Sequence, residues 1–67
     1  MTAFELIVKQ TEYEVRTLEE VVRLKSEGLG EMEIANLVGI SGTEVRLASE
    51  MKLKRAKERL KRYKRGF

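Results

Sequence analysis

The chain has 67 residues, with 14 Lys and Arg against 11 Glu, a net charge of +3, and neither Cys nor His. This length allows one small domain, and without Cys and His the usual nucleophiles, general bases and zinc ligands are missing, so we expect no enzyme, no cofactor and no metal site. No apolar run approaches the ~20 residues that cross a bilayer, and no signal segment is recognisable, which predicts a cytoplasmic protein without a membrane partner. Abundant Glu, Lys and Arg with few amides are typical of heat-adapted proteins.

Residues 1–16 are compatible with either a helix or two strands. A helix would begin at the capping box Thr2-Ala-Phe-Glu5 and would place apolar residues at alternating steps of four and three, the spacing of a packed seam. Strands would cover residues 4–8 and 13–17, which are rich in residues that favour β-structure. No turn residue joins these segments into a hairpin, so we expect a helical N-terminal extension.

The next segment, residues 17–51, begins with signals for one more helix. Thr17-Leu-Glu-Glu20 has capping-box spacing, and Gly28 is a suitable terminator. We therefore expect a helix over residues 18–27 that continues the first one as a long rod, bent near Thr17.

Two further helices follow, with small residues where they must approach each other. One is predicted from Glu31 to Val38, and Ala35 and Gly39 allow a close crossing and a tight turn after it. Ser41-Gly-Thr-Glu44 is another capping box, and no Pro or Gly follows before Gly66. The sequence therefore predicts a third helix that begins at Gly42 and continues to about Arg65.

This segment resembles the helix-turn-helix of LuxR-type regulators and sigma factors, and it also looks like small bacterial proteins with a coiled coil before such a unit. The matching residues are Glu20-Val-Val-Arg-Leu-Lys-Ser-Glu-Gly-Leu-Gly, Glu33-Ile-Ala, Leu37-Val-Gly-Ile-Ser and Glu44-Val-Arg. The resemblance implies an all-α fold with a tri-helical core, in which helix 42–54 enters the major groove of DNA. Val45, Ala48 and Met51 would face the core, and the DNA-facing residues would be Ser41, Thr43, Arg46, Leu47, Glu50 and Lys54.

The charges divide the chain into two unequal parts. Residues 1–51 carry a net −5, whereas the basic extension, residues 52–67, carries a net +8. Cations concentrated in this way are typical of nucleic-acid contacts, because they attract phosphates. The cations expected on phosphates, besides Lys54, are Arg55, Lys57, Lys61 and Arg62.

Apolar residues also recur through the basic extension, at Leu53, Ala56, Leu60, Tyr63 and Phe67, in steps of three and four. A three-helix core cannot bury both this seam and the N-terminal one, so the two seams must pack on each other or on a second copy of the chain. We expect a homodimer, with an interface formed by Phe4, Val8, Val15, Leu53, Leu60 and Tyr63.

The sequence thus predicts a homodimeric helix-turn-helix protein that binds double-stranded DNA, as a small transcriptional regulator or an architectural protein. An alternative is a protein-interaction adaptor that assembles through its helical seams. A further alternative is RNA binding through the basic extension without sequence preference.

Overall fold

The computed structural model describes residues 2–66, so the predicted seam residue Phe67 lies outside the described part of the chain. Four helices form, α1 (Ala3–Ser26), α2 (Glu31–Val38), α3 (Gly42–Leu47) and α4 (Glu50–Lys64). Residues 2–66 contain no strand, which confirms the all-helical prediction and rules out the β alternative for the described residues of 1–16. None of the four helices is long and apolar enough to cross a membrane.

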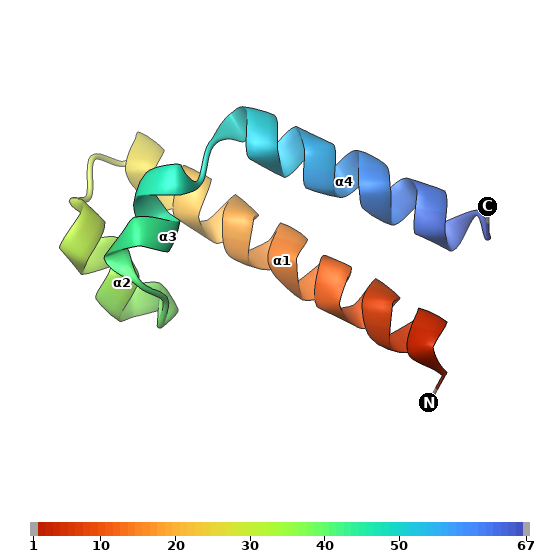
Figure 1. Ribbon diagram of the computed structural model, residues 1–67. Coiled ribbons are helices and arrows are strands. Elements are labelled where there is room, and N and C mark those ends of the chain that lie inside the picture. Colours follow the sequence, from red (N-terminus) through yellow and green to blue (C-terminus); the bar gives the residue numbers. More distant parts are fainter. Residues whose placement is uncertain (1, 67) are drawn as a thin grey trace.

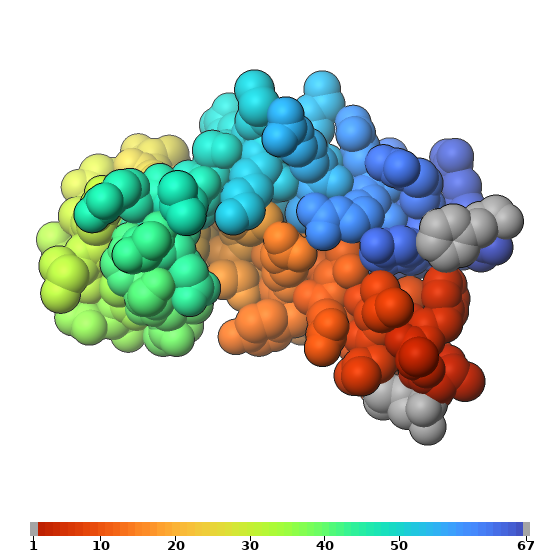
Figure 2. Space-filling model, viewed as in Figure 1, coloured from red at the N-terminus to blue at the C-terminus, as the bar shows by residue number. Residues whose placement is uncertain are grey.

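The helices form two regions (Figure 1). The hairpin consists of residues 3–17 of α1 and the whole of α4, which lies alongside α1 in the opposite direction. The tip, residues 18–48, consists of the end of α1 with α2 and α3 packed against it. In the space-filling view of Figure 2, α4 covers one side of α1, and the tip occupies one end of the molecule.

Helix α1 forms because both of its ends are satisfied and one face is apolar. The Thr2 hydroxyl accepts a hydrogen bond from the Glu5 amide at 3.1 Å. At the other end Gly28 adopts φ +90°, and the amide of Leu29 reaches back to the Leu24 carbonyl at 3.2 Å. This pattern closes a helix through a left-handed glycine. Helix α1 passes residue 17 without interruption, so the N-terminal extension and the core segment share one helix.

The turn between α2 and α3 also depends on a glycine at positive φ and on a helix cap. Gly39 adopts φ +81° and donates its amide hydrogen to the Ala35 carbonyl at 2.9 Å. A residue with a Cβ is strained at this φ, whereas Gly adopts it freely. The Ser41 hydroxyl then accepts from the Glu44 amide at 3.2 Å and caps α3. Both features agree with the small residue and the capping box that the sequence predicts.

The core lies mainly in the tip. Among residues 2–66, the largest fully buried side chains are Val21 of α1, Ile34 of α2 and Val45 of α3. Ala56 of α4 is also fully buried, and Leu53 and Leu60 pack partly against the same cluster. The remaining buried apolar residues are Val15, Leu18, Leu24, Ala35 and Ala48.

The predicted single helix from Gly42 to Arg65 is wrong. Helix α3 ends at Leu47, Ala48 has extended backbone (ψ 131°), and α4 begins at Glu50. Ala48 is buried, and its carbonyl accepts a hydrogen bond from the Lys25 ammonium at 2.7 Å. The Ser49 hydroxyl caps α4 by accepting from the Lys52 amide at 3.1 Å. These contacts provide hydrogen-bond partners for backbone groups at both new helix ends, so the Ala48 carbonyl is paired despite the break.

The break also overturns the prediction that Met51 faces the core. Its side chain is 65% exposed. Val45 and Ala48, predicted to face the core with it, are buried as expected. Because α4 starts afresh after Ser49 and lies along α1, its buried face is set by Leu53, Ala56 and Leu60 instead.

Candidate nucleic-acid interface

Helix α3 and its N-cap residue present four of the predicted DNA-facing residues to solvent. Ser41, Thr43, Arg46 and Leu47 are all exposed, while Val45 anchors the helix in the core. The Ser41 hydroxyl is engaged in the cap of α3. The Arg46 side chain is 70% exposed, and its Nε lies 3.7 Å from a carboxylate oxygen of Glu31. An exposed pair at this distance contributes little to stability and leaves Arg46 able to exchange partners.

Two cations of α4 form ion pairs with carboxylates of α1. Arg59 lies 3.8 Å from Glu14, and Lys64 lies 4.0 Å from Glu12. These pairs join the two helices of the hairpin. The other cations between residues 52 and 65 form no ion pair within residues 2–66, and they are Lys52, Lys54, Arg55, Lys57, Lys61, Arg62 and Arg65.

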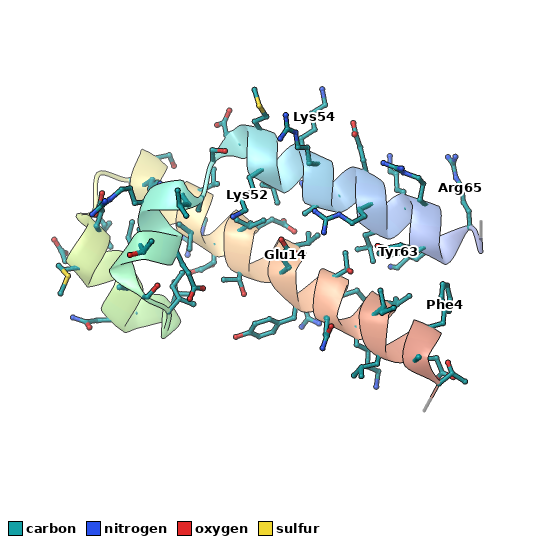
Figure 3. The ribbon with its side chains drawn as sticks, viewed as in Figure 1. Phe4, Glu14, Lys52, Lys54, Tyr63 and Arg65 are labelled. Atoms are coloured by element: carbon teal, nitrogen blue, oxygen red, sulfur yellow. The ribbon has the colours of Figure 1, made fainter. Side chains whose placement is uncertain are left out.

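The predicted phosphate-binding cations cover several adjoining faces of α4. Lys54 and Lys61 are seven residues apart and share a face of α4, and Figure 3 shows that Lys54 points away from α1. Lys57 lies on another side, where it borders a hollow with Glu19 and Glu20. Arg55 and Arg62, again seven residues apart, share a third face.

A hollow at the junction of α3 and α4 brings together a different group of side chains. We call it the junction hollow, and its walls are Leu47, Ser49, Met51, Lys52, Arg55 and Arg59. It contains three cations and no carboxylate. Each of four other hollows on the molecule has at least one Glu in its wall. The junction hollow therefore combines positive charge with an apolar surface.

Sequence reasoning identified two of the six wall residues of this hollow and missed the other four. The sequence predicts that Leu47 and Arg55 face DNA, but it places Met51 in the core and does not distinguish Lys52 and Arg59 from the other cations. The missed signal is Ser49, a residue type that often caps a helix. A helix that begins after Ser49 turns Met51 outward.

Glu50, another predicted DNA-facing residue, lies elsewhere. It is exposed in the first turn of α4 and borders a hollow with Val22, Lys25 and Ser26 of α1. It is absent from the walls of the junction hollow. Glu50 thus lines a different hollow from the apolar pair Leu47 and Met51.

The predicted seam residues meet within one chain. Val15 is buried, and Val8, Leu53, Leu60 and Tyr63 are partly buried between α1 and α4. Phe4 remains 43% exposed and borders a hollow with Val8 and Tyr63. Figure 3 shows Phe4 and Tyr63 at the end of the hairpin that carries both termini. The sequence left open whether the two seams pack on each other or on a second copy of the chain. In the structure they pack on each other, and the homodimer stays a prediction.

Residues 2–66 contain no cluster of three or more side chains suited to hold a metal ion. Comparison of the chain with models of protein families, with curated proteins and with solved structures gave no match. The functional argument therefore depends on the exposed side chains of α3 and α4.

Proposed function

We propose that this chain is a helix-turn-helix protein that binds double-stranded DNA, as a small transcriptional regulator or an architectural protein. In this proposal α2 and α3 are the two helices of the motif, and residues 18–26 of α1 are the third helix of a tri-helical core. The three-residue connection between α2 and α3, with Gly39 at positive φ, supports this assignment. Short turns of this kind join the two helices of DNA-binding motifs.

The proposed recognition helix is α3. Its exposed side chains have the chemistry that base edges and phosphates require. Arg46 can donate two hydrogen bonds to the O6 and N7 atoms of guanine, and the hydroxyl of Thr43 can reach a phosphate or a base. Glu31 is the competitor for Arg46, and it would be displaced when DNA binds.

The observation that carries the proposal is the set of six cations on α4, together with Arg65 directly after it, that have no carboxylate partner within residues 2–66. Helix α4 has 15 residues, which corresponds to a length of about 22 Å. Lys54 and Lys61 share one face of this rod and Arg55 and Arg62 share the adjoining face, so these four cations can follow a phosphate backbone. If four to six of them neutralise phosphates, log K falls by about 4–5 for each tenfold rise in salt.

The experiment begins with selection of duplexes from a random pool at two salt concentrations. An enriched sequence indicates specific recognition, and retention without enrichment indicates an architectural role. With the enriched duplex, we expect Arg46→Ala to weaken specific binding far more than binding to random DNA. Replacement of Lys61 and Arg62 by Gln should weaken both alike, because phosphates carry no sequence information.

A control variant separates local contacts from bulk charge. Lys9 and Arg16 lie on α1, so replacing both by Gln also removes two positive charges, but from a helix other than α4. We expect this variant to lose much less affinity than the Lys61 and Arg62 variant. Equal losses would mean that net charge alone attracts DNA, and no salt-sensitive binding of any duplex would contradict the proposal.

A protein-interaction adaptor is the second candidate, and one feature favours it. Leu6, Ile7 and Tyr13 on α1 are 45–65% exposed, and apolar side chains gathered on one element often mark contact with a protein. An adaptor would bind no duplex but would capture a protein partner. Replacement of Leu6 and Tyr13 by Glu would then abolish the capture.

A further inference from the structure

We propose that Leu47 and Met51 contact the methyl groups of thymine, so that the junction hollow selects thymine-containing DNA. This inference depends on the DNA-binding function proposed above and adds the base that the surface prefers. Leu47 is 60% exposed and Met51 is 65% exposed. Both line the same hollow, one from the last turn of α3 and the other from the first turn of α4.

The arrangement of charge around these two side chains points to a polyanion. Lys52, Arg55 and Arg59 stand in the same walls, and no carboxylate accompanies them. Lys52 also borders a neighbouring hollow with Glu14 and Glu44, and Arg59 is paired with Glu14. Arg55 has no such partner among residues 2–66, so it is the cation best placed to bind a phosphate next to the apolar pair.

A ligand that fits the junction hollow must carry negative charge and small apolar groups close to each other. Duplex DNA does so in its major groove, where the thymine methyl is the one apolar group that a base edge presents. With α3 in the major groove, Leu47 lies on the groove side of the helix, and Met51 extends the apolar surface past the break. The flexible thioether side chain of Met51 can adapt to methyl groups at more than one position.

An acidic amphipathic helix of a partner protein is a poorer match. Such a helix needs a groove with apolar positions for side chains at i, i+3, i+4 and i+7. The junction hollow supplies only Leu47 and Met51, and the other walls are polar. The cations also continue beyond the hollow along α4, which suits a long phosphate backbone better than one short helix.

The test uses two duplexes of 24 base pairs, one of alternating dA and dT and one of alternating dA and dU. They differ only in the methyl groups, and the repeat presents a methyl at every base pair, so no knowledge of a target site is required. We expect fluorescence anisotropy to show about fourfold weaker binding to the dU duplex for each thymine methyl that the protein buries, which is about 0.8 kcal/mol at 1.4 kcal/mol per tenfold. Burial of two methyl groups would give about 15-fold on the same scale.

Variants assign the effect to the two side chains. The double variant Leu47→Ala, Met51→Ala should bind both duplexes with equal affinity and keep the helical circular dichroism of the parent. The matched control is Met32→Ala, Leu37→Ala, which removes the same two residue types from exposed positions on α2. This control should keep the full preference for dT.

Three results would overturn the inference in different ways. If the parent binds both duplexes equally, thymine methyls are not read, although DNA binding stands. If the Leu47 and Met51 variant keeps the preference for dT, other side chains read the methyls. If neither duplex binds at any salt concentration, the DNA-binding function itself fails and this inference fails with it.

Discussion

The tip and the hairpin each contain part of helix α1, but different interactions stabilise the two regions. The tip contains seven of the nine buried apolar side chains found among residues 2–66, including Val21, Ile34 and Val45. The hairpin contributes only Val15 and Ala56 to that set, and its two ion pairs are long and exposed. Close-packed apolar side chains contribute far more stability than exposed ion pairs. Most of the fully buried apolar core therefore lies in the tip, whereas the hairpin is held by a partly buried apolar seam and presents charge.

The largest expected effect comes from the core of the tip. Ile34→Ala removes a fully buried side chain and should lower the free energy of unfolding by about 2–4 kcal/mol. Leu37→Ala on the same helix is the matched control, since Leu37 is 68% exposed, and it should change stability by less than about 0.5 kcal/mol. Urea unfolding followed by circular dichroism measures both. Equal losses would contradict the placement of the core.

An intermediate effect is expected at the connection between the tip and α4. Lys25→Met keeps much of the aliphatic chain but removes the hydrogen bond to the Ala48 carbonyl. The expected decrease in the free energy of unfolding is about 1–2 kcal/mol, because the variant removes a partly buried bond to a charged group. The same measurement on Lys9→Met, at an exposed position of α1, should show almost no decrease. A Lys25 variant as stable as the parent would mean that the break does not depend on this contact.

The smallest effect is expected from the ion pairs of the hairpin. Arg59→Gln removes the contact with Glu14, and an exposed pair of this kind is worth less than about 1 kcal/mol. We expect a change of less than about 0.5 kcal/mol in the free energy of unfolding, and less still at 1 M salt. A decrease as large as that of Ile34→Ala would show that charge, not the tip, holds the molecule together.

Much of the fold could be predicted because its signals are local. Thr2, Gly28 and Ser41 act within a few residues of their positions, and each forms the predicted cap or turn. The break at Ala48 was not predicted, because its cause is partly distant: Lys25 is 23 residues away from the carbonyl that it binds. Within this stretch, which lacks Pro and Gly, the only local signal of the break is the helix cap Ser49.

The candidate site likewise has a part that could be predicted from the sequence and a part that could not. Exposure of Arg46 and Leu47 on α3 could be predicted from helical periodicity, because Val45 faces the core. The junction hollow could not, because it exists only where two helices meet after the break. Seam spacing likewise identifies which residues pack but not whether the partner is the same chain or another copy.

The most direct test of the DNA-binding surface is an NMR titration of the ¹⁵N-labelled protein with a selected duplex. The account predicts that amide chemical shifts change at Thr43, Leu47, Met51 and Arg55. Amides near Leu6 and Ile7, which are exposed on α1 and absent from the walls of the junction hollow, should stay where they are. Changes confined to Leu6 and Ile7, or no changes at low salt, would contradict the account.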